Sequence, residues 1–353
     1  MAVVKANGYG HGAVEVARAA LQNGAQYLGV ARINEAIALR KAGLSEPILI
    51  FGYSPPDLAP LVIDYELTQT VYSLSTATAL SEHANRKGKK ITVHLKVDSG
   101  MGRLGFLLED IHTTPNNTSL NNPVREIETI TRLGGLTVEG IFTHFATADS
   151  TDKSYADLQL DRFMALLNRL QKEGLEPPLR HAANSGALID IPESHLDMVR
   201  PGIASYGLYP SDEINTSMVD LKPVMTLKSK IVHLKKVPPG FNISYGITYQ
   251  TKAHTTIATI PVGYADGFNR LLSSRGYMLV HGQRVPIVGR ICMDLTMLDM
   301  GEISGVALED EVVVFGEQGD EAITADEIAA SLGTINYEVV STITGRVPRV
   351  YLE

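Results

Sequence analysis

The 353-residue sequence predicts an α/β protein in which a (β/α)8 TIM barrel, residues 1–215, is followed by a mainly β domain, residues 216–353. Two observations predict this organisation. Short apolar segments alternate with amphipathic stretches through roughly the first 200 residues, and eight such units fit a closed barrel better than an open sheet. After Pro210 the pattern changes to long β-rich runs, which indicate a second domain.

The eight apolar segments are the expected barrel strands, at residues 1–5, 27–31, 48–51, 69–72, 93–97, 140–145, 179–182 and 196–199. Between them, residues 13–22, 34–42, 75–86 and 156–173 carry apolar side chains at three- and four-residue spacing. This spacing predicts amphipathic helices that cover a parallel sheet. Residues 113–122 are rich in Asn, Thr and Ser and are expected to form a mobile surface insertion.

The second domain is expected to be mainly β. Its β-rich runs cover residues 224–237, 255–262, 277–300 and 310–315. Only one clear helix is predicted there, over residues 324–332, because Thr324 and Glu327 have the spacing of a capping box at its start.

Composition excludes several classes of protein. A formal charge of −8 opposes nonspecific binding to nucleic acid or anionic lipid, and no apolar run approaches the roughly 18 residues of a membrane span. The one cysteine, Cys292, excludes an internal disulfide framework and a clustered cysteine zinc site. We therefore expect a cytoplasmic protein without a bound metal, a membrane partner or a nucleic-acid partner.

Polar residues close most of the expected strands. Active sites of barrels lie at the carboxyl ends of the strands, so these residues are candidates for one site. They are Lys5, Lys96, Asp98, Arg103, His144, Asn184, Ser185, Arg200 and Gly202. Each taken alone fits a capping or solvated residue equally well, and it is their convergence on one barrel mouth that favours a function.

Lys5 is the most informative of these residues. It leaves an apolar strand and enters the glycine-rich stretch that follows. Burial there would lower the pKa of its ammonium group and free the amine to form a Schiff base, which is the chemistry of a pyridoxal phosphate enzyme. The alternative is a lysine that ends a strand by reaching into solvent.

A second alternative is a dinucleotide-binding fold. Gly8, Gly10 and Ala13 satisfy the short glycine fingerprint after a strand and before a helix. That fold needs an acidic residue at the end of its second strand, where this chain has Arg32, with Glu35 already in the next helix. The dinucleotide interpretation also leaves the eight barrel units unexplained.

A family resemblance runs along the chain. The stretch AVVKANGYGHG, residues 2–12, closely resembles the pyridoxal phosphate attachment motif of alanine racemases. Further matching motifs follow in the family's order: VDSGMGRLG (97–105), THFA (143–146), HAANS (181–185), VRPGI (199–203), SYG (244–246), GYADG (263–267), GRICMD (289–294) and INYE (335–338). The resemblance covers both domains.

The resemblance implies a two-base racemase that interconverts L-alanine and D-alanine and supplies D-alanine for peptidoglycan. Lys5 would hold pyridoxal 5'-phosphate and then act as the base on one face of the substrate Cα, and Tyr245 would be the acid/base on the other face. A phenol needs its anion stabilised to do this, which the family achieves through residues that match His144 and Arg200. Arg200 would also donate to the pyridine nitrogen of the cofactor.

Further roles follow from the same resemblance. The cofactor phosphate would be bound by Tyr9, Ser185, Tyr337 and the backbone amides of Gly202 and Ile203, with Asn184 also in the cofactor site. Arg103 and the backbone amide of Met293 would hold the substrate carboxylate. Lys96 stands where many members carry a carbamylated lysine, whose anion would fix Arg103. Tyr264 matches an entry-gate tyrosine, and Cys292 a buried neighbour of the site.

Family members are head-to-tail homodimers, so Tyr245, Tyr264 and Met293 would act on the barrel of the partner. Relatives also carry about thirty residues before the lysine motif, so part of the first barrel strand is expected to be exposed here and an edge of the β domain unpaired. A serine or broad-specificity racemase stays open as an alternative. Two further alternatives are weaker: a non-catalytic pyridoxal phosphate carrier and a decarboxylase of the same fold. Carriers lack the β domain with its tyrosine, and residues 292–294 do not resemble the decarboxylase pattern.

Overall fold

The computed structural model describes residues 1–108, 123–301 and 303–352, so the predicted insertion at 113–122 lies outside the described residues. The chain divides into two compact units. The first consists of Met1–Gly8 and Gly12–Lys222, and the second of Tyr9–His11 and Pro223–Glu353. The three residues after Gly8 therefore belong with the second unit, although both of their flanking segments belong to the first.

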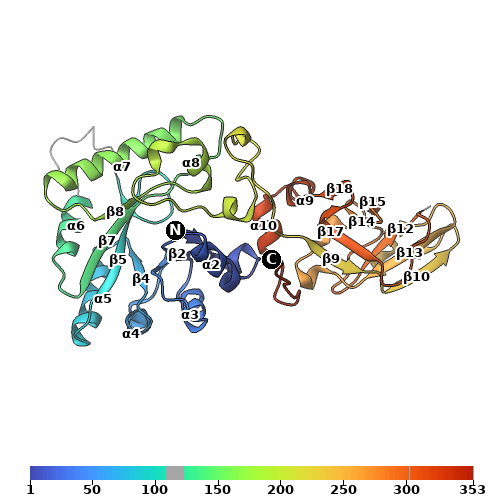
Figure 1. Ribbon diagram of the computed structural model, residues 1–353, viewed down its shortest axis with the longest axis horizontal. Coiled ribbons are helices and arrows are strands. Elements are labelled where there is room, and N and C mark those ends of the chain that lie inside the picture. The colour runs from blue at the N-terminus through green and yellow to red at the C-terminus, as the bar shows by residue number, and fades with distance from the viewer. Residues whose placement is uncertain (109–122, 302, 353) are drawn as a thin grey trace. The chain divides into compact units, whose positions relative to one another are not determined.

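The first unit is built on a curled parallel sheet (Figure 1). Its strands are hydrogen-bonded in the order β1 (Ala2–Val3), β2 (Leu28–Val30), β3 (Ile48–Ile50), β4 (Thr68–Val71), β5 (Ile91–Asp98), β7 (Leu136–Phe142) and β8 (Leu179–His181). A short strand β6 (Phe106–Leu107) pairs with the end of β5. Most residues of β1 to β5 are buried, which explains why these strands form apolar runs in the sequence.

The predicted eighth strand, residues 196–199, is not a strand. Leu196 has a φ of 48°, and Pro201 lacks a backbone donor, so a regular ladder ends at both sides of this segment. Its backbone still bonds to both neighbours in the barrel. Arg200 N donates to Ala183 O at 3.0 Å, and Val3 N donates to Pro201 O at 3.3 Å. The extended segment thus takes the eighth position between β8 and β1, and the predicted barrel architecture is confirmed.

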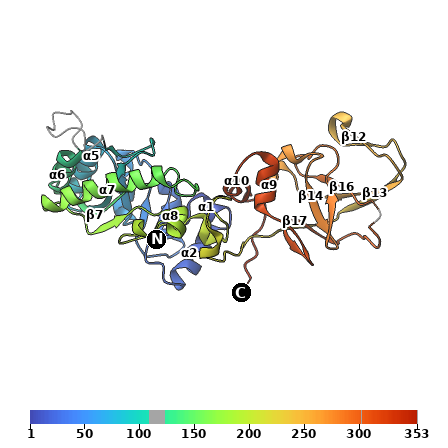
Figure 2. The same cartoon turned by 90° about the horizontal axis from the view of Figure 1, so that it is seen from above.

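Helices cover the outside of this sheet (Figures 1 and 2). They are α2 (Ala13–Gln22), α3 (Ile33–Lys41), α4 (Ala59–Asp64), α5 (Leu74–Arg86), α6 (Pro123–Thr131), α7 (Ser154–Lys172) and the short α8 (Ser185–Asp190). Ile48 and Ile50 belong to the larger cluster of buried residues, whereas Leu49 belongs to a separate cluster with Phe142. Since neighbouring strand residues point to opposite faces, the first cluster lies under the helices and the second lies inside the barrel.

The first strand is buried rather than exposed. Ala2, Val3 and Val4 expose at most 6% of their surface. Val4 N donates to Gly29 O at 2.8 Å, and Tyr206 Oη donates to Val3 O at 2.9 Å.

The second unit is mainly β, as predicted. Three sheets are formed by β10 (His233–Val237), β13 (Thr255–Ile260) and β16 (Thr296–Asp299); by β11 (Asn242–Ile243) and β12 (Tyr249–Gln250); and by β9 (Leu227–Lys230), β14 (Tyr277–Val280), β15 (Gln283–Pro286), β17 (Glu311–Gln318) and β18 (Glu321–Ile323). Pairing within these sheets is antiparallel.

Two helices, not one, follow these strands. The predicted helix is α9 (Ala325–Leu332), and its cap Thr324 accepts from Glu327 N at 3.0 Å. The second helix, α10 (Asn336–Ser341), was not predicted, because its Tyr337 and the pair Val339–Val340 are typical of strands. Burial of Val339 and Val340 on one side of the helix outweighs this weak preference.

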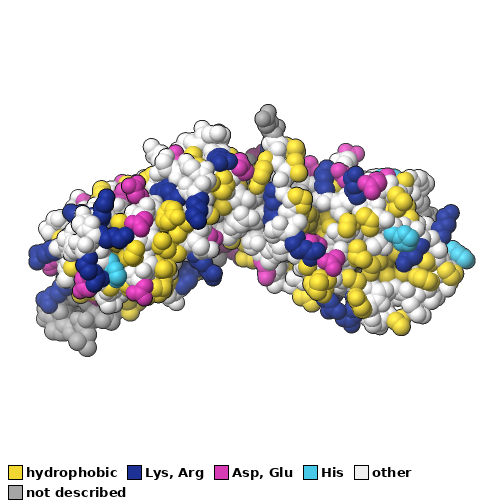
Figure 3. Space-filling view, turned by 90° about the horizontal axis from the view of Figure 1, so that it is seen from below, with side chains coloured by type: hydrophobic (Ala, Val, Ile, Leu, Met, Phe, Trp, Pro, Cys, Tyr) yellow, Lys and Arg dark blue, Asp and Glu magenta, His cyan; other side chains and the backbone are white. Residues whose placement is uncertain are grey.

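The surface carries charges of both signs. On the face drawn in Figure 3, acidic and basic side chains are interspersed over the described residues rather than gathered into a basic stripe. In the described part of the chain, no helix combines the length and the apolar character needed to cross a membrane.

Candidate active site

Lys5 begins a left-handed turn at the carboxyl end of β1. This turn is labelled α1 (Lys5–Tyr9), but Ala6, Asn7, Gly8 and Tyr9 have φ values of 52°, 54°, 61° and 51°. The left-handed conformation costs a residue with a side chain roughly 1–2 kcal/mol. Strain of this kind is often found at functional sites, where the surrounding structure holds it in place.

Glu35, near the start of α3, holds this turn. Its Oε1 accepts from Ala6 N at 2.7 Å, and its Oε2 accepts from Ala31 N at 2.8 Å and Arg32 N at 3.0 Å. The carboxylate therefore joins the lysine turn to the end of β2. In the sequence, Glu35 stands out only as an acidic residue too late in the chain to bind a nucleotide, and its role as a backbone acceptor was not predicted.

Lys5 lies in a cationic cluster with Lys96, Arg103 and Arg200. Burial lowers the pKa of Lys5, and Arg103 lowers it further. Burial, with Arg103 and Arg200 nearby, lowers the pKa of Lys96 to about 8. These cations thus disfavour one another's charge, so the cluster is suited to an anionic ligand.

Asp98 offsets the charge of the cluster only in part: it opposes the lowering of the pKa of Lys96, but its carboxylate is directed to the backbone. It accepts from Gly100 N, Gly102 N and Arg103 N at 3.0, 3.1 and 3.0 Å. This carboxylate instead fixes the loop that carries Arg103.

Arg200 is buried and held by the ends of β7 and β8. Its Nη2 donates to Thr143 O at 2.8 Å and Ala182 O at 2.9 Å, and lies 3.3 Å from His144 Nδ1. Its Nη1 lies 2.9 Å from His181 Nδ1. Burial lowers the pKa of Arg200 to about 9, which leaves it charged at neutral pH. Burial and the nearby Arg200 hold the pKa of His144 well below its ordinary value, so His144 is neutral.

The loop after β8 brings together the predicted phosphate ligands of the first unit. Asn184 caps α8 by accepting from Ala187 N at 3.0 Å. Ser185 Oγ accepts from Gly202 N at 2.9 Å, so Gly202 and the adjacent Ile203 lie beside this hydroxyl group. Hydroxyl and peptide donors of this kind are suited to a phosphate.

The other predicted phosphate ligands lie in the second unit. The rings of Tyr9 and Tyr337 have centroids 6.1 Å apart, and burial raises the pKa of Tyr9 to about 12. Arg349 donates to Gly10 O through Nε at 3.0 Å and Nη2 at 2.7 Å. The C-terminal segment therefore fixes the residues that follow the lysine turn.

Tyr245, the predicted second base, stands on a strained turn of the second unit. Its side chain is 71% exposed. Ser244 before it has φ 63° and ψ −175°, a region occupied almost only by glycine. Ser244 Oγ donates to Arg290 O at 2.6 Å, which anchors the turn. Tyr264 and Met293 are also exposed, at 42% and 53%.

The structure thus groups the predicted site residues in two sets. Lys5, Lys96, Arg103, His144, Asn184, Ser185, Arg200, Gly202 and Ile203 lie in the first unit, and Tyr9, Tyr245, Met293 and Tyr337 in the second. The sequence analysis gave no role to His94 or His181. Their signal was present, because His94, Lys96 and Asp98 alternate along β5 and so share the inner face of the barrel.

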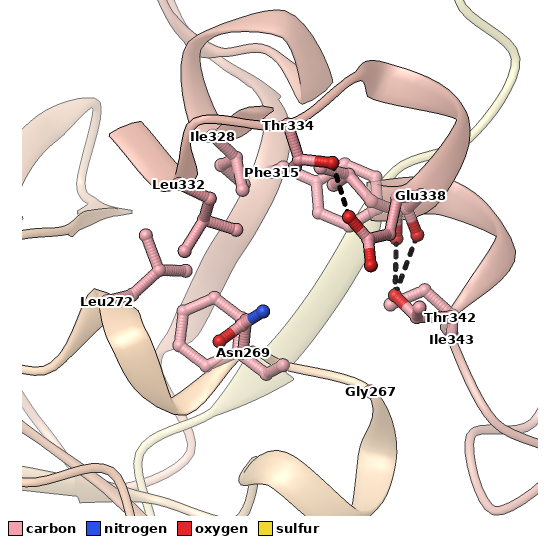
Figure 4. A pocket seen from close by; sticks show the side chains of 12 residues that line it. Gly267, Asn269, Leu272, Phe315, Ile328, Leu332, Thr334, Glu338, Thr342 and Ile343 are labelled. Carbon is pink, nitrogen blue, oxygen red and sulfur yellow. Dashed lines mark hydrogen bonds between the residues drawn. The ribbon is translucent and has the colours of Figure 1, made fainter. Parts of the chain in front are cut away.

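One cavity of the second unit is too small for this chemistry (Figure 4). It lies among residues that include Leu272, Phe315, Leu332 and Ile343, and its volume is about 30 Å³. That is about the volume of one water molecule, whereas ligand sites enclose roughly 300–1,000 Å³.

Comparisons with known proteins identify the family. The family model described as "Alanine racemase, N-terminal domain" matches residues 1–210, and "Alanine racemase, C-terminal domain" matches residues 224–351. The chain belongs to the alanine racemase family. An alanine racemase of Desulfosudis oleivorans is 55% identical over 352 residues, which cover 99% of this chain and 89% of that protein. The solved alanine racemase of Clostridium difficile is 44% identical with a TM-score of 0.92, covering 99% of this chain and 88% of that one.

Alanine racemases are isomerases that depend on pyridoxal phosphate, so the predicted family, enzyme class and cofactor are confirmed. The cationic cluster around Lys5, of which Lys96 and Arg200 are buried, fits this cofactor, whose phosphate and phenolic oxygen are anionic. The same architecture occurs in a histidine racemase of Leuconostoc mesenteroides, at 30% identity and a TM-score of 0.90, covering 100% of this chain and 91% of that one.

Proposed function

We propose that this chain interconverts L-alanine and D-alanine with Lys5 and Tyr245 as its two bases. The observation that carries the proposal is the position of Lys5: it lies in a partly buried cationic cluster at the mouth of a barrel, with a lowered pKa. A neutral amine can take a proton from carbon, which a charged ammonium group cannot. Residues 1–215 would bind the cofactor, and residues 216–353 would supply the second base.

Several residues would hold the cofactor. Lys5 would attach it, Arg200 would donate to its ring nitrogen, and His144 and Asn184 would line the ring. Ser185, Gly202, Ile203, Tyr9 and Tyr337 would bind the phosphate. When bound, pyridoxal phosphate withdraws electrons from the substrate Cα and so acidifies its hydrogen. Arg200 is suited to the ring nitrogen because its guanidinium is already fixed by two carbonyl groups.

Tyr245 would move the proton on the face of Cα opposite Lys5. A phenol does this only if a nearby cation stabilises its anion, and Arg200 with His144 would do so. Arg103 and the backbone N–H of Met293 would hold the substrate carboxylate and so present Cα between the two bases.

Lys96 would carry a carbamate. Its pKa of about 8 leaves part of the amine neutral near pH 7, and only the neutral amine adds CO₂. Starting from the ammonium group, the reaction releases two protons, one as the amine becomes neutral and one as it adds CO₂. It thereby replaces a cation with an anion, which would fix Arg103.

Tyr245 and Met293 are mostly exposed, and we infer that a second copy of the chain covers them in a homodimer. Each active site would then combine Lys5 of one chain with Tyr245 of the other. The protein would act in the cytoplasm.

Circular dichroism of L-alanine over time tests the proposed activity. We expect decay of optical activity, together with a visible cofactor band that borohydride abolishes. Both should disappear in Lys5→Ala, whereas Tyr245→Phe should keep the band and lose racemisation. A band without racemisation in the unaltered chain would contradict the proposal and favour a pyridoxal phosphate carrier.

A broader substrate range is the second candidate, because a histidine racemase shares this architecture. Serine differs from alanine by one hydroxyl group, which an apolar pocket separates poorly. The same assay with L-serine and L-histidine distinguishes the two: rates comparable to that for L-alanine would favour the broader enzyme.

A further inference from the structure

A chain of polar side chains runs through the interior of the barrel and ends at Arg200. We call it the barrel relay; its members are Tyr27, Glu139, His94, His181 and Arg200. Tyr27 Oη lies 2.8 Å from Glu139 Oε2, and His94 Nε2 lies 3.0 Å from the same oxygen. His94 Nδ1 lies 2.9 Å from His181 Nε2, and His181 Nδ1 lies 2.9 Å from Arg200 Nη1.

The relay can hold its protons in only one arrangement. A guanidinium group only donates, so His181 Nδ1 must accept from Arg200. The neutral His181 then carries its proton on Nε2 and donates to His94 Nδ1. His94 in turn carries its proton on Nε2 and donates to Glu139. Every bond therefore points from Arg200 toward the carboxylate.

The charges agree with this arrangement. Burial and the nearby Arg200 hold the pKa of His181 well below its ordinary value, so this imidazole stays neutral. The hydrogen bond from His94 lowers the pKa of Glu139, so this carboxylate stays ionised at neutral pH. A proton added to His181 Nδ1 would face an N–H group of Arg200 and break the chain.

The backbone is shaped to accommodate the relay. The β5–β7 register shifts between Val93 and His94, where Val93 pairs with Val138 and His94 with Gly140. Glu139 is the extra residue of this bulge, and bulges commonly redirect a side chain. A Cβ on Gly140 would lie 2.7 Å from the ring of His94, so only glycine leaves room for this imidazole.

The upper part of the relay is packed by one aromatic ring. Phe142 stacks on His181 with a centroid distance of 4.7 Å and an interplanar angle of 9°, and Arg200 Cζ lies 5.3 Å from the same ring. Barrel interiors are usually filled by branched apolar side chains. Polar groups buried there destabilise the fold unless they are fully hydrogen-bonded. A purely structural barrel would not need two histidines in this position.

We propose that Glu139, at the bulge in the middle of β7, is a positioning residue for Arg200: through His94 and His181 it fixes the orientation of the guanidinium group. Its negative charge makes each imidazole a stronger acceptor for the donor that follows. The consequence for the cofactor nitrogen rests on the proposed function. The orientation of Arg200 and the proton positions in the two histidines do not.

NMR of protein labelled with ¹⁵N-histidine and ¹⁵N-arginine tests the relay, with the holoenzyme and the cofactor-free protein measured separately. We expect His94 and His181 both to carry their proton on Nε2, and His181 to stay neutral at neutral pH because burial and Arg200 lower its pKa. Glu139→Gln keeps the size of the side chain but removes its charge, and should shift the His181 and Arg200 signals. Glu139→Leu also removes the acceptor, and should mix the two tautomers of His181 and speed hydrogen exchange at Arg200.

Two matched controls separate the relay from packing and from surface charge. Leu49→Val alters the packing of the interior cluster that also holds Tyr27 and Phe142 but removes no hydrogen-bonding group, and should leave both tautomers in place. Glu128→Gln removes a carboxylate of helix α6 that forms an ion pair with Arg132, and should change neither signal.

The signals of His181 and Arg200 decide the outcome. If they are unchanged in folded Glu139→Gln, the charge at position 139 does not reach Arg200 and the proposal is overturned, whether or not Glu139→Leu folds. In the holoenzyme, Glu139→Gln should lower kcat several-fold with little change in KM. A protein that has no racemase activity but shows the expected tautomers would contradict the proposed function and leave the relay intact.

Discussion

Ser244 shows how a single residue can set the direction of a neighbouring side chain, here that of Tyr245, the proposed second base. Its backbone lies in a region that favours glycine, yet the sequence keeps a serine whose hydroxyl donates to Arg290 O at 2.6 Å. The hydroxyl group therefore compensates the strain and fixes the turn that presents Tyr245.

Substitution of Ser244 tests whether its hydrogen bond compensates the backbone strain. Ser244→Ala keeps the strain and loses the hydrogen bond, so we expect the free energy of unfolding to fall by about 1 kcal/mol. Ser244→Gly loses the same bond but relieves the strain, and should be more stable than the alanine variant by about 1 kcal/mol. Chemical denaturation measures both. An alanine variant as stable as the glycine variant would show that the turn is unstrained.

Asp98 makes the stability of the first unit depend on pH. Burial by itself would raise the pKa of this carboxyl, but hydrogen bonds from Gly100, Gly102 and Arg103 outweigh it and lower the pKa below its ordinary value. A lowered pKa means that the carboxylate stabilises the fold fully above its unfolded pKa, near pH 4, and that this contribution is lost as the pH falls further.

We expect Asp98→Asn to lower the free energy of unfolding by about 2 kcal/mol at pH 7, because the amide keeps only one accepting oxygen and turns a donor toward the backbone N–H groups that the other oxygen had accepted from. The difference from the unaltered protein should shrink below about pH 4. Urea denaturation from pH 3 to pH 7 measures it. Asp64→Asn is the control, since Asp64 is an exposed partner of Lys87; an equal loss in both variants would contradict this assignment.

Among the elements, the left-handed turn and helix α3 are joined by the side chain of Glu35. Three backbone N–H groups, of Ala6, Ala31 and Arg32, converge on this carboxylate. The helix therefore supports the strained turn that carries Lys5. Burial and Arg103 lower the pKa of Lys5, and the charge of Glu35 opposes this shift without reversing it.

Removing this carboxylate should loosen the turn. We expect Glu35→Ala to lower the free energy of unfolding by about 2 kcal/mol and to weaken retention of the cofactor, because Lys5 loses its fixed direction. Thermal unfolding and the visible cofactor band after dialysis measure the two effects. Glu15→Ala, on α2, removes an exposed carboxylate that pairs with Arg18, and should change neither.

Most of the strands and helices of the barrel could be predicted from the sequence. Buried parallel strands form short apolar runs, so seven barrel strands and helices such as α2 could be located from the pattern alone. The eighth position could not, because the left-handed Leu196 depends on tertiary contacts and not on local preference. Helix α10 was not predicted for a related reason: its valines have a local preference for strands, and only their burial in the folded protein outweighs it.

The candidate site was partly predictable for physical reasons as well. Lys5, Lys96, His144 and Arg200 follow strands, and parallel strands end at one mouth. The left-handed turn could not be predicted, because Ala6 and Tyr9 disfavour it and only Glu35 and the surrounding packing hold it. Glu139 was equally hidden, since a bulge turns it inward against the alternation of β7.

At the scale of the whole molecule, the two proposed bases lie in different units. Lys5 belongs to the first unit and is partly buried, whereas Tyr245 belongs to the second and is 71% exposed. In a homodimer with shared sites, the exposed side chain of Tyr245 would be covered by the partner chain. The arrangement predicts that two inactive variants restore each other.

Mixing Lys5→Ala chains with Tyr245→Phe chains tests this sharing. Random pairing makes half of the dimers mixed, and each mixed dimer has one intact site, so we expect roughly a quarter of the activity of the unaltered protein. If both bases came from the same chain, no intact site could form and the mixture would stay inactive. Chains with two different affinity tags allow the mixed dimer to be purified, which shows that it exists before its activity is measured. Because Tyr245 is largely exposed, its replacement by phenylalanine should leave folding unchanged, so recovered activity reports the sharing of the site and an inactive purified mixed dimer refutes it.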